Sequence, residues 1–149
     1  MYTHLLVATD GSELAQKGVS HGLNLAKALG AKVTLLTVTE PFPVYGSASA
    51  VGWVPDGNDI AAYESGQEEA ARATLAKASE AAATLGVVAD TVHVPNARPA
   101  EAIVETAGKY GCNLIVMASH GRRGLGRMLL GSQTAEVVSH SPLPVLVVR

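Results

Sequence analysis

Glycines, arginines and one hydroxyl residue gather late in this chain in a pattern that suits an anion. Gly121 and Gly131 can let backbone N–H groups approach a ligand closely, and Ser132 stands where we expect the N-cap of a helix. Three of the six arginines lie in the same segment: Arg122, Arg123 and Arg127. Glu136 is the only acidic residue after Gly111, so the local field is expected to be positive. The segment therefore predicts a phosphate site.

Two common phosphate motifs do not explain this segment. Residues 126–132 copy the glycine spacing of a P-loop, but no lysine precedes Ser132 and two leucines stand where polar backbone would cradle phosphates. A dinucleotide fingerprint needs its glycines directly after the first strand, and only Gly11 is present there. We therefore exclude a P-loop and find little support for an ordinary dinucleotide site.

The elements that must position these residues alternate between apolar runs and segments of helical period. We expect strands at residues 4–9, 32–39, 87–95, 113–118 and 145–148. We expect helices at residues 13–29, 59–85, from 98 onward and 132–140, with Ser12 as a cap and Gly30 and Gly86 as ends. This alternation predicts the α/β class, with helices on both faces of a parallel sheet. Residues 40–58 are expected to form a long loop, suited to a lid, a partner surface or partial disorder.

Right-handed crossovers place the strands in the order 3-2-1-4-5, a single doubly wound sheet of Rossmann-like type. The winding reverses between the first and fourth strands, and ligands of such sheets bind outside the carboxyl ends of the strands at the reversal. Asp10, at the end of the first strand, then lies beside the 119–132 loop. An aspartate there can act simply as a helix cap, but its place at the reversal favours a role in ligand binding.

Length and composition limit the classes of function. The 149 residues suit one domain, 1–149, and 48% hydrophobic with 16% charged residues predicts a folded chain. A net charge of −2 excludes a protein-wide electrostatic footprint for nucleic acid. No apolar stretch is long enough to cross a bilayer, and the first residues do not resemble a signal peptide. We therefore expect no nucleic-acid or membrane partner and a cytoplasmic location.

Other reactive residues receive simpler interpretations. Cys112 is the only cysteine, so it excludes an internal disulfide framework and is expected in the core. The five histidines are scattered without metal-ligand spacing, and no metal site made by protein ligands alone is expected. His120 could touch a phosphate, although polar packing is the favoured explanation.

The late segment resembles the universal stress protein family. Nucleotide-binding members of that family carry the pattern G-x2-G-x9-G-[ST] after the fourth strand. Gly121, Gly131 and Ser132 fill its later positions, and Ala118 stands at the first. The opening residues 5–12 and the closing residues 144–148 are also similar, so the resemblance covers the whole chain. It implies a fold like that of the adenine nucleotide alpha hydrolases and an ATP ligand.

The resemblance also implies roles for individual residues. Adenosine would lie against Ala8, Thr9, Asp10 and Val38, with Met117 and Ala118 beneath it. The phosphates would meet Gly121, Arg123, Gly131, Ser132 and Gln133. Asp10 would repel phosphate unless it accepts ribose hydroxyls or coordinates a Mg²⁺ held by the phosphates, so Mg²⁺ is expected with the ATP.

These features predict a small ATP-binding universal stress protein, a regulatory or stress-protective module whose nucleotide state governs unidentified protein partners. Paired carboxylates and a Ser-His-Asp set are not evident, so we expect at most slow ATP hydrolysis. Ala118 suggests one alternative, a nucleotide-free dimeric scaffold. A receiver-type phosphoacceptor domain is another, ranked lower because residues 94–96 contain no aspartate and residues 145–149 no lysine.

The last strand predicts self-association. Residues 145–148 are apolar on both alternating faces and are expected at the sheet edge, where their backbone would lack a neighbour. Two such edges can pair antiparallel about a two-fold axis, which is also how universal stress proteins commonly dimerise. We therefore expect a homodimer through Val145 to Val148.

Overall fold

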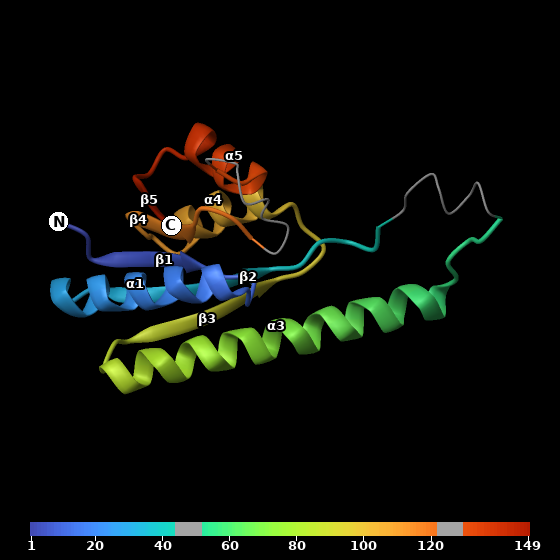
Figure 1. Ribbon diagram of the computed structural model, residues 1–149, viewed down its shortest axis with the longest axis horizontal. Coiled ribbons are helices and arrows are strands. Elements are labelled where there is room, and N and C mark those ends of the chain that lie inside the picture. The colour runs from blue at the N-terminus through green and yellow to red at the C-terminus, as the bar shows by residue number, and fades with distance from the viewer. Residues whose placement is uncertain (44–51, 122–129) are drawn as a thin grey trace.

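A five-stranded parallel sheet forms the centre of the molecule (Figure 1). The computed structural model describes residues 1–43, 52–121 and 130–149. The strands are β1 (His4–Ala8), β2 (Lys32–Val38), β3 (Ala89–Val94), β4 (Leu114–Ala118) and β5 (Val145–Val148). The helices are α1 (Glu13–Leu29), α3 (Gly57–Leu85), α4 (Pro99–Lys109) and α5 (Ser132–His140).

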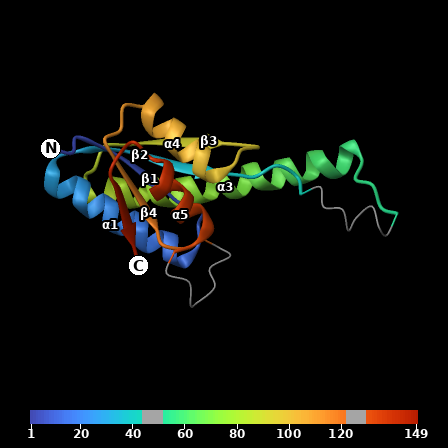
Figure 2. The ribbon, with the colours of Figure 1, turned by 90° about the horizontal axis from the view of Figure 1, so that it is seen from above.

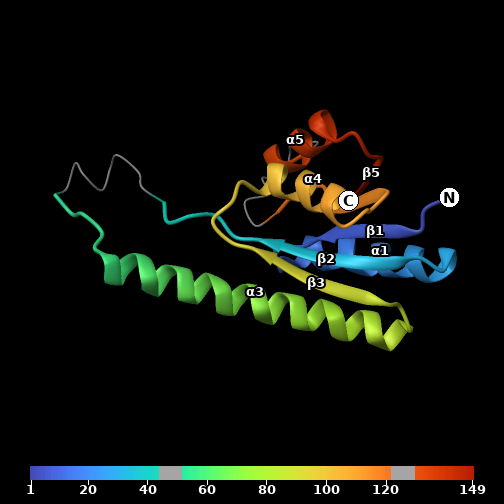
Figure 3. The same cartoon turned by 180° about the vertical axis from the view of Figure 1, so that it is seen from behind.

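The strand order is β3-β2-β1-β4-β5, which confirms the predicted topology. Every neighbouring pair is parallel, and the central pairs include Val7 with Leu35 and Val7 with Val116. Helices α1 and α3 cover one face, and α4 and α5 cover the other (Figures 1 and 3). The winding therefore reverses between β1 and β4, as expected, and β3 and β5 are the edge strands.

Alternate residues of each strand enter two separate cores. Leu5, Val7 and Val116 pack toward α1 and α3, whereas Leu6 and Ile115 pack toward α4 and α5. All of these side chains are fully buried, as expected for parallel strands covered on both faces. Gly22 of α1 lies so close to the sheet that a Cβ atom there would be 2.8 Å from Val7 Cγ2. The glycine is therefore needed for the close approach of helix and strand.

Capping residues fix most helix ends where the sequence predicts them. Ser12 Oγ accepts the N–H of Ala15 at the start of α1, and Gly30 ends that helix with a φ of 65°. Helix α3 begins at Gly57 rather than at the expected residue 59, because Asp56 and Asp59 form a capping box ahead of the alanine-rich stretch. Several strands are shorter than predicted by one or two residues, and β3 begins at Ala89 rather than at residue 87.

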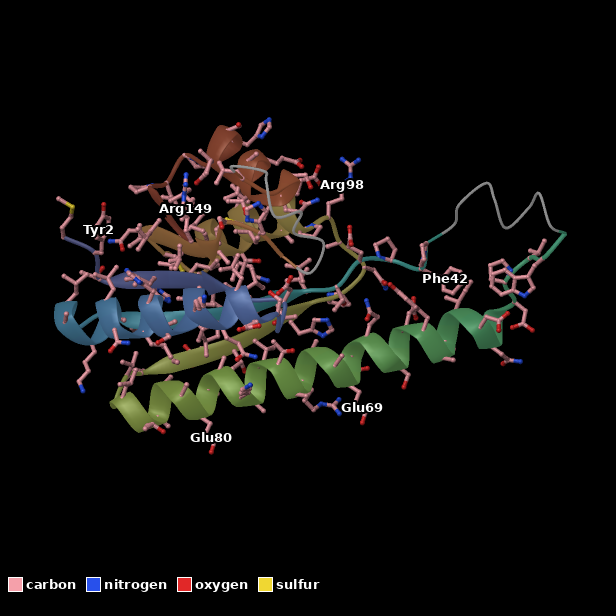
Figure 4. The ribbon with its side chains drawn as sticks, in the orientation of Figure 1. Tyr2, Phe42, Glu69, Glu80, Arg98 and Arg149 are labelled. Carbon is pink, nitrogen blue, oxygen red and sulfur yellow. The ribbon has the colours of Figure 1, made fainter. Side chains whose placement is uncertain are left out.

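Helix α3 extends well past the sheet (Figures 1 and 2). Its buried residues all lie from its middle onward: Ala71, Leu75, Ala78 and Ala82. Glu69 and Glu80 point away from the sheet (Figure 4). Near the first turns of the helix, the Phe42 ring meets Tyr63 edge-on at 5.2 Å and Trp53 at 6.4 Å between ring centres. These rings supply packing where the sheet no longer does.

A buried histidine joins two strands inside the sheet. His4 Nε2 lies 2.8 Å from Thr34 Oγ1, and both residues are buried. Burial lowers the pKa of His4 below its ordinary value, and the positive charge of Lys32 acts in the same direction. The folded state therefore favours the neutral imidazole. Among the described residues, no helix is long and apolar enough to cross a membrane.

Candidate functional site

A cavity of about 380 Å³ opens at the carboxyl edge of the sheet, over the winding reversal. The structure brings together every predicted site residue that it describes. These residues line the cavity: Ala8, Thr9, Asp10, Val38, Met117, Ala118, Gly121, Gly131, Ser132 and Gln133. The remaining one, Arg123, lies outside the described residues, as do Arg122 and Arg127.

One wall of the cavity is apolar. Ala8, Val38 and Met117 lie at or next to the last residues of three neighbouring strands and pack on the same face of the sheet, toward α4. Ile103 of α4 closes this side, and Pro99 adds to it at the start of that helix. Such a wall suits a flat apolar group, because the strand ends form a level surface of small and medium side chains.

The backbone of Val38 adds polar groups beside this wall. Even-numbered residues of β2 turn their backbone toward β1, since Lys32 N–H donates to the Thr3 carbonyl and Thr9 N–H donates to the Leu36 carbonyl. The last pair between these strands is Ala8 with Leu36, so Val38 extends two residues beyond it. Within the described part of the chain, its N–H and C=O meet no backbone partner on that side. They can therefore bond to a ligand.

The opposite side of the cavity is the start of α5. Gly131, not Ser132 as predicted from the sequence, is the N-cap, and Ser132 is the first residue of the helix. The Gly131 N–H donates to the Ser119 carbonyl at 2.7 Å. This bond ties Gly131 to the end of β4, so the N-cap lies one residue earlier than expected. Gly131 has no side chain with which to cap this helix, whereas the side chains of Ser12 and Asp56 cap α1 and α3. The first N–H groups of α5 therefore face the cavity with their partial positive charge.

Gln133 has a structural role that the sequence does not reveal. Its side-chain Oε1 accepts the N–H of Ala100 at 3.1 Å, in the first turn of α4. Helix α4 receives no cap from its own N-cap residue, Arg98, so Gln133 serves as a cap from another helix. Only the backbone N–H and the amide nitrogen of Gln133 remain for the predicted phosphate contact.

Asp10 and Gly121 depend on each other. Asp10 Oδ1 accepts the N–H of Ser12 at 2.9 Å, which fixes the carboxylate at the start of α1. The other oxygen, Oδ2, lies beside Gly121, and a Cβ atom at Gly121 would be only 2.6 Å from it. Gly121 thus makes room for the carboxylate, a reason for glycine that the motif alone does not give.

Ala118 stands in β4 where the family motif has glycine, and the structure shows where its methyl group fits. The residue is buried, and its backbone is outside the left-handed region that would demand glycine. A Cβ atom built on Gly18 of α1 would be 3.7 Å from the Cβ of Ala118 and 3.3 Å from its N. The methyl group therefore points toward α1, where Gly18 leaves space. Thr134 Oγ1 also donates to the Ala118 carbonyl and ties α5 to the strand.

A further group of lining residues was not predicted. Tyr63, Gln67 and Thr74 of α3 reach the cavity, together with Glu40 after β2. Gln67 Nε2 donates to the Tyr63 hydroxyl at 3.1 Å, so two of these side chains support each other. Tyr63, Gln67 and Thr74 are separated by four and seven residues, which places them on one face of a helix. This spacing is the signal in the sequence that could have identified them.

Burial describes the surroundings of two other residues considered from the sequence, Cys112 and His120. Cys112 lies in the core, as expected, and burial raises the pKa of its thiol, which disfavours the reactive thiolate. His120 lines the cavity, but its Nε2 is buried without a hydrogen-bond partner in the described structure. Simple polar packing, the interpretation favoured from the sequence, leaves that nitrogen unexplained.

A doubly wound parallel sheet with a cavity at its winding reversal, between apolar strand ends and the start of a helix, defines a Rossmann-like α/β protein. More narrowly, the chain belongs to the universal stress protein family, whose sequence profile matches residues 1–149.

Individual relatives agree with this assignment. Universal stress protein YxiE of Bacillus subtilis is 35% identical over 150 residues, with 100% of both chains covered. The solved structure of the Methanocaldococcus jannaschii protein MJ0577 is similar at a TM-score of 0.79 and 29% identity, covering 99% of this chain and 96% of that one. A universal stress protein solved in complex with cAMP has a TM-score of 0.68 and 24% identity, covering 99% and 97% of the two chains.

Proposed function

We propose that this chain binds an adenine nucleotide, ATP with Mg²⁺, and acts as a cytoplasmic regulatory or stress-protective module whose nucleotide state governs protein partners. The observation that carries the proposal is the cavity itself. One side is an apolar wall at three strand ends, and the other is the N-terminus of α5, whose N-cap residue, Gly131, has no side chain. A nucleotide has this same division between a flat base and charged phosphates. The relative solved with cAMP shares the fold, and at 24% identity that likeness concerns the fold alone.

The base belongs against the apolar wall. Ala8 and Met117 offer an apolar surface, and the outward N–H and C=O of Val38 offer one donor and one acceptor at its edge. Adenine presents an acceptor ring nitrogen next to a donor amino group, whereas guanine presents a carbonyl where adenine has the amino group. We therefore expect the backbone of Val38 to select ATP over GTP.

The phosphates belong at the start of α5. Backbone N–H groups at a helix N-terminus bind anions through hydrogen bonds and through the helix dipole. Glycine suits position 131, because a Cβ atom there would be 3.2 Å from the Ser119 carbonyl oxygen, a contact that requires a small shift of the neighbouring backbone. Ser132 adds a hydroxyl at the first helical position. Arg123 is proposed as a further phosphate contact on its sequence position alone.

A Mg²⁺ ion, if it accompanies ATP, would depend on the phosphates for most of its ligands. The described residues contain no group of three acidic, histidine or cysteine side chains that could hold a metal. Asp10 brings one carboxylate to the cavity, and one carboxylate with phosphate oxygens is a usual Mg²⁺ arrangement. The residues present therefore fit a Mg²⁺ carried in by ATP.

The strand order argues against the receiver-type alternative. Receiver domains have the order 2-1-3-4-5, which sets the first and third strands side by side. Here β2 separates β1 from β3, so an acidic cluster of the receiver kind cannot form at those strand ends. The nucleotide-free scaffold remains the competing function, and ligand binding decides between them.

Thermal unfolding in the presence of nucleotides tests the proposal. A ligand at about 100 times its Kd that binds only the folded state raises the free energy of unfolding by about 2.7 kcal/mol. We expect a clear rise in Tm with ATP, a larger one with Mg²⁺, and a smaller one with GTP. An unchanged Tm at millimolar ATP would favour the scaffold.

A matched pair of variants locates the site. Ser132→Ala removes one hydroxyl contact to a charged group and should weaken ATP binding by about 1.5–3 kcal/mol. Ser139→Ala on the exposed side of α5 serves as the control, since its hydroxyl donates to the Ala135 carbonyl of the same helix. Equal affinities for the two variants would show that the start of α5 is not the phosphate site.

A further inference from the structure

Only one of the two ring nitrogens of His120 has a hydrogen-bond partner among the described residues. Nδ1 lies 3.0 Å from the Ser119 hydroxyl, whereas Nε2 is buried and has no hydrogen-bond partner among the described residues. It is the one side-chain nitrogen or oxygen within the described part of the chain that is buried in this way. Buried polar atoms in native proteins almost always have a hydrogen-bond partner, so this nitrogen points to a group that is bound during function.

The place of the ring indicates what that group is. His120 lines the cavity, and its Cδ2, the carbon bonded to Nε2, would be 3.7 Å from a Cβ atom on Gly131. The ring edge that carries Nε2 is therefore next to Gly131, the N-cap of α5, which has no side chain to cap the helix. The helix N–H groups at this end need an acceptor, so the common partner must be rich in acceptor oxygens. A phosphate oxygen meets this requirement.

Ser119 can set the ring in the matching tautomer. A neutral imidazole has one N–H, and a hydroxyl that donates to Nδ1 leaves the proton on Nε2. Ser119 is buried and its carbonyl is held by the Gly131 N–H, so its backbone position is fixed relative to α5. The serine thereby orients both the ring and the helix start.

We propose that His120 Nε2–H donates a hydrogen bond to a phosphate oxygen of the nucleotide at the start of α5, and that Ser119 is its positioning residue. This rests on the proposed nucleotide function and deepens it. His120 then distinguishes a nucleotide from a nucleoside, because adenosine has no phosphate to meet Nε2.

Calorimetric titration with AMP and adenosine, without Mg²⁺ and at one pH, tests this role. His120→Phe keeps a ring beside Gly131 but removes the donor, and the ratio of AMP affinity to adenosine affinity should fall about tenfold, which corresponds to about 1.4 kcal/mol. His120→Gln keeps an N–H near the same place and should retain the ratio within about threefold. His140→Phe is the control, because this histidine is exposed at the far end of α5.

The tautomer provides a readout that a purely structural role would not move. ¹⁵N spectra of the imidazole should show the proton on Nε2, a shift of that nitrogen on AMP addition, and a lower Nε2–H fraction in Ser119→Ala. An unchanged affinity ratio in His120→Phe, equal losses for AMP and adenosine, or a proton on Nδ1 in the AMP complex would overturn the role of His120. Failure of the wild type to bind either ligand would overturn the proposed function as well, so the two failures are distinguishable.

Discussion

Gly121 is small because a carboxylate occupies the space that a side chain would need. A Cβ atom there would be 2.6 Å from Asp10 Oδ2. We expect Gly121→Ala to displace the carboxylate and to weaken binding of ATP with Mg²⁺ about tenfold or more, while Mg²⁺-free AMP loses less. Calorimetry on both ligands measures the difference.

Gly108→Ala in α4 is the matched control, since a Cβ atom there meets nothing within 4 Å. Equal affinities of the wild type and Gly121→Ala for ATP with Mg²⁺ would show that Asp10 is not placed for the metal.

His4 should make stability depend on pH. Its pKa in the folded state is lowered by burial, so below about pH 6.5 the unfolded chain binds a proton that the folded chain resists. The free energy of unfolding therefore falls as pH falls, by up to about 1.4 kcal/mol per pH unit for this one group. The contribution is fully present well above pH 6.5.

His4→Gln removes the titration and keeps a polar group near Thr34. Urea unfolding of both proteins from pH 7.5 to 5 should show the wild type losing stability faster than the variant. Parallel curves for the two proteins would contradict the prediction. His21→Gln, on the exposed surface of α1, is the control for the loss of a histidine as such.

At the scale of elements, the contact between α1 and the sheet depends on Gly22. Gly22→Ala places a Cβ atom 2.8 Å from Val7 Cγ2, and Val7 is fully buried. We expect a loss of about 1–3 kcal/mol in the free energy of unfolding, because an overpacked core must shift. Chemical denaturation measures it.

Gly66→Ala should change the free energy of unfolding in the opposite direction. Gly66 is exposed in α3 with nothing within 4 Å of its Cβ position, so alanine should add about 0.5–1 kcal/mol through helix propensity alone. A stabilising Gly22→Ala would show that α1 can move away from the sheet without loss.

The elements could be predicted because the hydrophobic period and the glycine and capping residues at the segment ends agree, and the residues of the candidate site could be expected to lie together because they follow neighbouring strands. The continuous run at residues 4–8 predicts a doubly covered strand, and Gly30 and Gly86 predict helix ends. Gln133 could not be predicted, since its cap joins it to Ala100, 33 residues away. The true N-cap of α5 was missed for the same reason: the bond from Gly131 to Ser119 is tertiary.

At the scale of the whole molecule, β5 remains the proposed dimer edge. Ile115 N–H donates to the Pro144 carbonyl and Ser119 N–H to the Val148 carbonyl, so the even-numbered residues of β5 turn toward β4. Val147 therefore turns its N–H outward, where a second copy can accept it. The structure thus identifies which residues a dimer would use.

Val147→Pro removes that outward donor without touching the β4 ladder and should shift the protein toward monomer in sedimentation. Leu146→Pro, which breaks a bond to β4, is the comparison, and it should instead lower the stability of the monomer. A wild type that is monomeric at tens of micromolar, with no concentration dependence, would contradict the dimer.

The ring contacts beside α3 give the molecule its own optical reporter. Trp53 is the single tryptophan and is half-exposed, so its emission is sensitive to its surroundings. Its ring meets Phe42, Phe42 meets Tyr63, and Tyr63 lines the cavity (Figure 4 marks Phe42). A ligand that moves Tyr63 therefore changes the environment of the indole through two aromatic contacts. Intrinsic fluorescence, with no added label, should follow occupancy of the cavity in real time.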